Sequence, residues 1–305
     1  MAGPSFRGAP LRVRVPATSA NLGPGFDALG LALTLYDDVV VRVTDEPGLT
    51  VDVAGMGAAS VPRNGRHLVV KAMRSTFKVL GGAPRGLELV AANHIPHGRG
   101  LGSSAAAIVA GVVAARALVV GGSERLDDDG VLALAARLEG HADNVAACLL
   151  GGATVAWCDP NGAAHALGVD VHPSLAPVAF VPGSSSSTKV ARRLLPDLVP
   201  HADAALNASR AALLVEALRS RPDLLLAATE DRLHQGYRAA AMPRTAALVA
   251  ELRAAGIPAV MSGAGPTVLA LTTADGRERA LGYQRRGWTA LALDVDRTGT
   301  GVSTL

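Results

Sequence analysis

The chain has 305 residues, of which 49% are hydrophobic, 18% are charged and 3% are aromatic. This length and apolar content suit one large domain or two ordinary ones and disfavour a disordered chain. The 29 basic and 26 acidic side chains leave a formal charge of +3 spread along the chain, which disfavours nucleic acid as a partner. Cys148 and Cys158 are too few for a disulfide framework, so we expect a cytoplasmic protein.

The sequence also disfavours export and membrane insertion. Its first twenty residues hold no apolar core of signal-peptide length. The longest apolar run, 105–120, is interrupted by Arg116 and is shorter than the ~20 residues that span a bilayer. We therefore expect no membrane partner.

The first half of the chain begins with strand patterns and continues with helical ones. Alternating or β-branched runs predict strands at 11–15, 39–43, 49–53, 86–92 and 153–157. Apolar residues at helical spacing predict helices at 68–80, 103–120 and 131–150, the last with a break near Gly140.

The second half is richer in helices. A β-like stretch at 167–181 and a loop of small residues at 183–187 come first, and we place a boundary between two domains in that neighbourhood. Beyond it the pattern predicts helices at 189–195, 202–219, 243–254 and 277–283, and strands at 259–261, 268–271 and 289–293. The predicted class is α+β, with domains at 1–165 and 166–305.

The segment PHGRGLGSSAA is the most informative in the chain. Its alternating glycines let the backbone approach a ligand closely, and they lead directly into a long Ala/Val helix whose first N–H groups can bind phosphate. A bare Gly-x-Gly-x-Gly can equally be a turn followed by a serine cap, but the whole string is far more specific. The candidate phosphate-binding residues are Pro96, His97, Gly98, Arg99, Gly100, Leu101, Gly102, Ser103, Ser104, Ala105 and Ala106.

Two further loops are candidates for a binding site. PATSANLGPGFD, at 16–27, leaves a strand and presents Asn21 and Asp27, although an Asx turn and a helix cap would explain these two residues as well. SGAGPT, at 262–267, joins two apolar strands and is either part of the site or only a tight turn.

Taken together, these three loops resemble the three motifs of the GHMP kinases, which occur here in the family's order along the chain: 16–27, 96–106 and 262–267. Four segments are similar to the homoserine kinase branch of that family: PATSANLGPGFD at Pro16, EGHADNVAACLLGG at Glu139, SSTKVARRLLP at Ser186 and DRLHQGYRAA at Asp231. The resemblance is nearly full length. It implies that the first domain binds ATP and has a fold like domain 2 of ribosomal protein S5. It also implies a ferredoxin-like second domain that contributes to the substrate pocket.

The resemblance also implies the parts of a phosphoryl-transfer site. The phosphate loop would hold ATP, while the Ser104 hydroxyl and the Glu139 carboxylate would hold Mg²⁺, a hard ion that prefers oxygen ligands. Many relatives have a longer insertion between the residues that correspond to Glu139 and His141, so matching Glu139 requires a gap. Taken alone, Glu139 would be an ordinary solvated helix residue.

For L-homoserine the family motifs imply a zwitterion pocket. They place Asp27 at the ammonium, Arg192 and Arg238 at the carboxylate, and Asn144 at the reacting hydroxyl, with Asp27, Asn144 and Arg238 as the candidate catalytic residues. Asn21, His141 and Thr188 would complete the pocket. Because an asparagine cannot act as a base, catalysis would rest on positioning and electrostatics.

The chain departs from the family pattern at two positions, and two other functions are alternatives to this interpretation. His67 stands where the family commonly has Asn near the adenine, and Gly236 replaces a usual Pro. The rivals are another GHMP kinase that acts on a mevalonate-like alcohol, and a nucleic-acid-binding module with an S5-like fold. The sequence leaves the oligomeric state open, a homodimer included.

Overall fold

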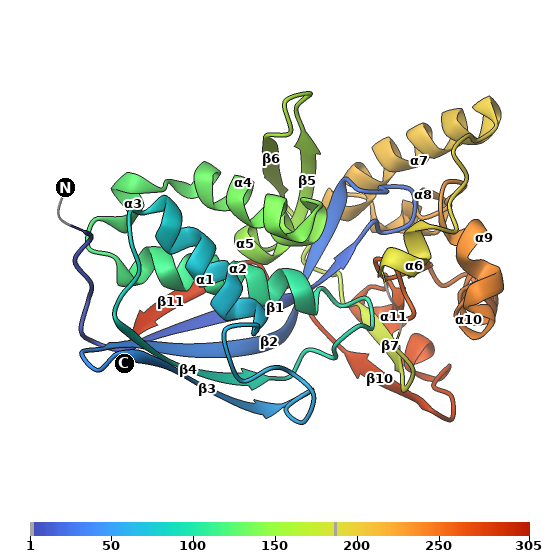
Figure 1. The fold of residues 1–305 in the computed structure, drawn as a ribbon. Helices are drawn as coiled ribbons and strands as arrows, with labels where there is room; N and C mark the ends of the chain where they lie inside the picture. Colours follow the sequence, from blue (N-terminus) through green and yellow to red (C-terminus); the bar gives the residue numbers. More distant parts are fainter. Residues whose placement is uncertain (1–2, 186–187) are drawn as a thin grey trace.

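The computed structural model describes residues 3–185 and 188–305, with residues 188 and 189 described by their backbone alone. Two sheets organise the chain (Figure 1). In the seven-stranded sheet, β11-β1-β2-β4-β3 form a continuous path and a β5–β6 hairpin extends from β2. Its strands are β1 (Leu11–Ala20), β2 (Leu29–Thr44), β3 (Gly48–Gly55), β4 (Gly86–Asn93), β5 (Ala153–Cys158), β6 (Ala164–Val169) and β11 (Gly301–Thr304).

Helices cover one face of this sheet in Figure 1. The crossover between the parallel strands β3 and β4 contains α1. The break expected near Gly140 is present, because Gly140 has a φ of 96° and ends α4. The helices of this half are α1 (Leu68–Val79), α2 (Ser103–Leu118), α3 (Gly122–Arg125), α4 (Asp128–Glu139) and α5 (Asp143–Leu150).

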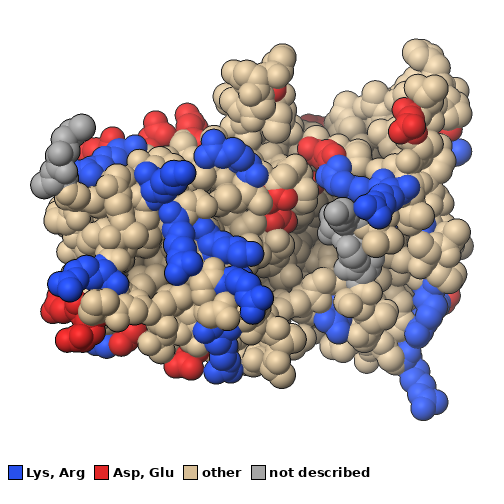
Figure 2. All heavy atoms as spheres, in the orientation of Figure 1, with Lys and Arg blue, Asp and Glu red and all other residues tan. Residues whose placement is uncertain are grey.

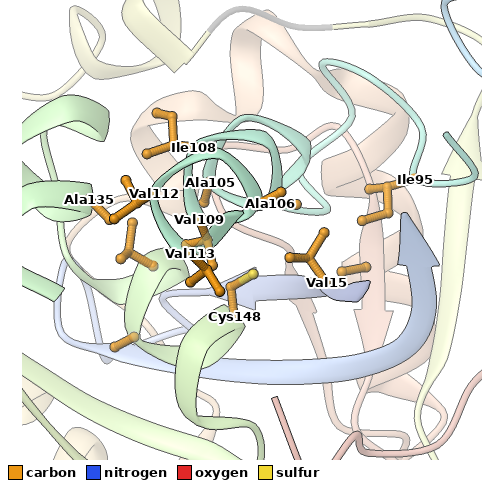
Figure 3. Close-up of a cluster of buried hydrophobic side chains, with 14 of the residues drawn as sticks. Val15, Ile95, Ala105, Ala106, Ile108, Val109, Val112, Val113, Ala135 and Cys148 are labelled. Atoms are coloured by element: carbon orange, nitrogen blue, oxygen red, sulfur yellow. The ribbon is translucent and has the colours of Figure 1, made fainter. Parts of the chain in front are cut away.

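The central helix of the first core is α2. Its sequence is apolar on every side, as expected for a helix surrounded by other elements. Figure 3 shows its side chains facing Val15 of β1, Ala135 of α4 and Cys148 of α5. This packing fixes the N-terminus of α2 next to the end of β1.

The second sheet has the order β10-β7-β9-β8 and is antiparallel throughout. Counted along the chain within this sheet, the order is 4-1-3-2, with helices in the first and third connections, which is the ferredoxin-like pattern. Its strands are β7 (Val178–Pro182), β8 (Ala259–Met261), β9 (Val268–Ala270) and β10 (Trp288–Ala292). The helices of this half are α6 (Thr188–Arg192), α7 (His201–Arg219), α8 (Leu225–Ala228), α9 (Gln235–Arg238), α10 (Pro243–Ala254) and α11 (Ala274–Leu281).

The structure confirms the α+β class. The division expected between residues 165 and 166 falls inside β6, which pairs with β5 in the larger sheet, and the C-terminal strand β11 returns to pair with β1. The position of the boundary between the two domains stays a prediction. Within 3–185 and 188–305, no helix combines the length and apolar character needed to cross a membrane.

Candidate active site

A pocket of about 130 Å³ lies where the three predicted loops meet. Figure 2 shows a hollow between two lobes on this face, with Lys and Arg side chains gathered beside it in the region of α1. The pocket brings together residues from both halves of the chain. Of the predicted site residues, its lining contains Asn21, Asp27, Gly98, Gly100, Gly102, Ser103, Ser104, Glu139, His141, Asn144, Arg192 and Arg238.

The phosphate loop leads into α2 without a capping side chain. Gly98, Gly100 and Gly102 all have positive φ, at 63°, 78° and 69°. Gly102 is the N-cap of α2 and no side chain accepts a hydrogen bond from the first turn, so these N–H groups remain available to an anion. A serine cap, the alternative reading of the string, is not what the structure has.

The remaining residues of the phosphate-loop string have different surroundings. The side chains of Leu101, Ala105 and Ala106 are buried in the core, so they support the loop rather than face the pocket. Arg99 donates to the carbonyl oxygens of Pro182 and Gly183, at 2.9 and 2.7 Å, and so ties the loop to the end of β7. Pro96 is buried and His97 is half-buried.

The loop after β1 is strained. Asn21, Leu22 and Asp27 have φ values of 67°, 51° and 56°, a region that non-glycine residues rarely occupy. Asn21 holds the loop at two points: its Oδ1 accepts from Asp27 N–H at 2.9 Å and its Nδ2 donates to Gly263 O at 2.9 Å. Asn21 therefore shapes the loop that presents Asp27.

Ser104 and Glu139, the two predicted metal ligands, are in direct contact. The Ser104 hydroxyl donates to Glu139 Oε2 at 2.7 Å. Burial raises the pKa of the Glu139 carboxyl, and the Ser104 hydrogen bond opposes that shift. A carboxylate that loses solvation in this way would be stabilised by a cation.

Asn144 is held from one side. Thr18 donates to Asn144 Oδ1 at 2.8 Å, which leaves the amide Nδ2 to point a donor at the pocket. Asp143 was given no role by the sequence reading, yet it is 2% exposed and accepts from Asn144 N–H at 2.7 Å. Its Oδ1 also lies 2.8 Å from His141 Nδ1, and this hydrogen bond raises the pKa of His141.

The two predicted carboxylate-binding arginines differ in their surroundings. Arg192 is exposed at the pocket and forms an ion pair with Asp27 at 2.6 Å. Arg238 is 1% exposed, and no carboxylate of the described residues lies within 4.0 Å of its guanidinium. The predicted contact of Thr188 lies outside the described side chains.

Sequence reasoning gave no role to four residues that form or support the site. Phe26 and Asp143 line the pocket, Thr18 donates to Asn144, and His234 contacts the Arg238 guanidinium. All four lie inside segments that the sequence analysis singled out: Thr18 and Phe26 in PATSANLGPGFD, Asp143 in EGHADN and His234 in DRLHQGYR. The segments therefore located the site, but only the contacts distinguish these residues from their neighbours.

Comparison with known proteins decides the family. The family model described as "GHMP kinases N terminal domain" matches residues 67–152, and "GHMP kinases C terminal" matches residues 204–285. The homoserine kinase of Streptomyces coelicolor is 62% identical over 302 residues, covering 99% of this chain and 97% of its own. The chain belongs to the homoserine kinase family. A second homoserine kinase, from Clavibacter michiganensis subsp. michiganensis, is 54% identical over 97% of this chain and 94% of its own.

Solved structures agree with membership in the homoserine kinase family. The crystal structure of homoserine kinase from Cytophaga hutchinsonii is 25% identical, with a TM-score of 0.81, and covers 99% of this chain and 100% of its own. A putative homoserine kinase from Listeria monocytogenes is 32% identical, with a TM-score of 0.75 and a coverage of 97% of this chain and 99% of its own. The two-domain GHMP kinase fold expected from the sequence is thus confirmed.

Proposed function

We propose that this chain transfers the γ-phosphoryl group of ATP to the side-chain hydroxyl of L-homoserine, giving ADP, O-phospho-L-homoserine and a proton. One observation carries the proposal: a single pocket combines a carboxylate, two guanidinium groups, an amide donor and the uncapped start of α2. A small zwitterion with one alcohol needs this set of groups beside a phosphate site. The likeness to homoserine kinases over the whole chain supports the same substrate.

The acceptor would bind by charge at both ends. Asp27 would receive its ammonium, and Arg192 and Arg238 would receive its carboxylate, because a guanidinium can bind a carboxylate through two parallel hydrogen bonds. The buried charge of Arg238 supports this assignment, since an unpaired cation in such a site favours an anionic ligand. Asn21, His141 and Thr188 would complete the pocket.

Phosphoryl transfer would rely on placement and charge stabilisation. The N–H groups of the phosphate loop and the N-terminus of α2 would neutralise phosphate oxygens, and Asn144 would donate to the reacting hydroxyl or to the transferring group. Thr18 fixes the orientation of the Asn144 amide. Asn144 has no basic atom for the hydroxyl proton, so we assign it a positioning and electrostatic role.

A magnesium ion fits the Ser104–Glu139 pair. Both ligand atoms are oxygens, and the buried carboxylate favours a cation. In the described part of the chain, no cluster of three or more His, Cys, Asp or Glu side chains could hold a metal by itself. The ion would then take its other ligands from phosphates and water. When bound, Mg²⁺ would neutralise charge on the phosphoryl oxygens of ATP.

A second pocket, of about 250 Å³, is our candidate for the adenine. It shares Ser103 and Ser104 with the first pocket. Most of its other lining residues are apolar, and the polar ones are Asp37, Arg66, His67, Asn93 and His97. His67 is 5% exposed, and within the described residues its Nδ1 makes no hydrogen bond. The imidazole would take the place of the amide that the family commonly has here.

The rival acceptor, a mevalonate-like alcohol, carries a carboxylate but no ammonium group, so it would leave Asp27 without a partner in the pocket. No observation favours nucleic acid. A cytoplasmic location and a homodimer stay predictions. The test is ADP release with homoserine, mevalonate, galactose or no acceptor, and with homoserine methyl ester. Among these acceptors, we expect ADP release with homoserine and not with mevalonate or galactose. The rate of ADP release should fall heavily when the methyl ester replaces homoserine. Equal use of the acid and the ester would contradict the carboxylate assignment and with it the choice of substrate.

A further inference from the structure

We propose that His234 is a positioning residue that joins the two charged ends of the acceptor pocket. The residue immediately precedes α9, its side chain is completely buried, and it is not part of the pocket lining. It contacts both the loop that carries Asp27 and the guanidinium of Arg238. The proposal rests on the proposed function only where homoserine is named as the acceptor.

The two hydrogen bonds of the imidazole require the same tautomer. Nε2 lies 2.8 Å from Gly23 O, and a carbonyl oxygen only accepts, so Nε2 carries the proton. Nδ1 lies 2.9 Å from Arg238 Nη1, and a guanidinium only donates, so Nδ1 offers a lone pair. His234 is therefore neutral and protonated on Nε2.

The surroundings of the ring keep it neutral. Burial lowers the pKa of His234, and the nearby positive charge of Arg238 acts in the same direction. Asp231 opposes this, but its carboxylate is 3.8 Å from Nε2 and is engaged by the backbone N–H groups of residues 233, 234 and 235. Asp27 is the other charged group that acts on the ring, and Phe26 packs on it with centroids 5.3 Å apart.

On one side, His234 fixes the direction of Arg238. Two other acceptors of the guanidinium, Ala191 O and Gly263 O, are both at 3.3 Å, so the bond to Nδ1 is the shortest of the three. Among the described side chains, no carboxylate lies within 4.0 Å to hold the group instead. Without the imidazole acceptor, the guanidinium would lose its best-defined anchor.

On the other side, His234 holds the strained loop. Gly23 follows two left-handed residues, Asn21 and Leu22, and precedes Asp27, which is left-handed as well. Such backbone conformations persist only where the surrounding structure over-determines them. The bond from Nε2 to Gly23 O supplies one constraint, and that from Asn207 Nδ2 to Pro24 O, at 2.7 Å, supplies another. One side chain thus sets the spacing between the anionic and cationic ends of the pocket.

Three variants separate the two bonds. His234→Asn keeps an acceptor near the place of Nδ1, His234→Gln keeps a donor near the place of Nε2, and His234→Leu keeps neither. We expect KM for homoserine to rise roughly ten- to hundredfold in the Leu variant and less in the other two. KM for ATP and the Kd for ADP should stay within about twofold of wild type. His172→Asn, a half-buried histidine outside the pocket, is the matched control.

Two readouts distinguish positioning from a merely structural role. Nitrogen-15 spectra of histidine-labelled protein should show the His234 ring, identified by its absence in His234→Asn, as neutral with its proton on Nε2. In an Arg238→Met background, His234→Gln should raise KM for homoserine much less than in wild type, because the lost acceptor no longer serves a guanidinium.

A ring protonated on Nδ1, or an equal rise of KM for both substrates, would overturn the proposal. So would an undiminished effect of His234→Gln in the Arg238→Met background. If wild-type protein does not use homoserine at all, the proposed function fails, while the tautomer still decides the hydrogen-bond assignment.

Discussion

Asp27 and Arg192 form a two-point ion pair at the mouth of the proposed acceptor pocket, with Nη1 and Nη2 of the arginine 2.9 and 2.6 Å from the two carboxylate oxygens. The resemblance to the family implies that these residues bind opposite ends of the substrate. A zwitterionic substrate can pair with both side chains only if the Asp27–Arg192 ion pair breaks and each residue forms a new ion pair with the substrate. We therefore expect substrate binding to be an exchange of ion pairs. Their side chains are 38% and 40% exposed, and an exposed pair of this kind costs little to break.

Because Arg238 is buried and Arg192 is exposed, their replacement should have different effects on homoserine binding. Truncating a buried charged partner costs roughly 2 to 5 kcal/mol, or about thirtyfold to several thousandfold in affinity, whereas an exposed one costs less than about 1 kcal/mol. Arg238→Met should therefore raise KM for homoserine far more than Arg192→Met. Steady-state kinetics with homoserine varied at saturating ATP measures this, with KM for ATP as the internal control. A larger effect at Arg192 would contradict the ranking.

The metal assignment predicts altered magnesium dependence. Loss of a supporting group around a metal site typically lowers metal affinity by about 10- to 100-fold, and loss of a direct ligand should cost at least as much. Glu139→Gln and Ser104→Ala should therefore need roughly tenfold more Mg²⁺ for half-maximal turnover. Glu124→Gln, an exposed residue of α3 outside the pocket, is the control. Mg²⁺ titration curves that superimpose on wild type would remove both residues from the ligand set.

Gly102 and Gly121 form a matched pair for testing the phosphate loop. Both are helix N-caps with a φ of 69°, so an alanine costs similar backbone strain at either position, on the order of 1–2 kcal/mol. Only at Gly102 would the added Cβ meet Thr18 Oγ1 and come within 3.1 Å of Asn144 Oδ1. Gly102→Ala should lower both ADP affinity, by calorimetry, and turnover. Gly121→Ala should lower only Tm, and equal losses of affinity in both variants would count against the loop.

The burial of the Asp37 carboxyl predicts that the stability of the fold depends on pH. Burial raises its pKa above the ordinary 3.8, although it accepts hydrogen bonds from the backbone N–H groups of His94 and Ile95. A raised folded pKa means that the folded protein binds this proton more tightly than the unfolded chain. The associated stability is present below the unfolded pKa, near 3.8, and is lost as pH rises through the folded pKa. At pH 7 the ionised carboxylate therefore costs stability.

Asp37→Asn removes that charge and keeps an oxygen acceptor. We expect its Tm to exceed that of wild type at pH 7 and the difference to vanish towards pH 4. The neighbouring Asp38→Asn is the control, because Asp38 accepts from Arg12 at 2.8 Å and its replacement should not raise Tm. Thermal unfolding followed by circular dichroism at both pH values measures the effect. A lower Tm for Asp37→Asn at pH 7 would show that the two backbone hydrogen bonds outweigh burial.

Local patterns in the sequence determined much of this protein. The expected helix at 68–80 is observed as α1, Leu68–Val79, and that at 103–120 as α2, Ser103–Leu118, because apolar spacing and glycine stops act within a few residues. The same locality identified the phosphate loop, where glycine conformation and the start of a helix are properties of adjacent residues. The α+β class followed from the order of the expected strands and helices, and the segments around Asn21, Asn144 and Arg238 followed from motifs.

Tertiary structure decided the contacts between distant residues. The pairing of β11 with β1, the Thr18–Asn144 bond across 126 positions and the His234–Gly23 bond across 211 positions leave no periodic trace in the sequence. The ion pair of Asp27 with Arg192, and the burial of Arg238 without a carboxylate partner among the described residues, also depend on how the two sheets pack together. Hydrogen bonds and burial act through space, so residue types can propose a role, but only the folded chain determines which partner each polar group meets.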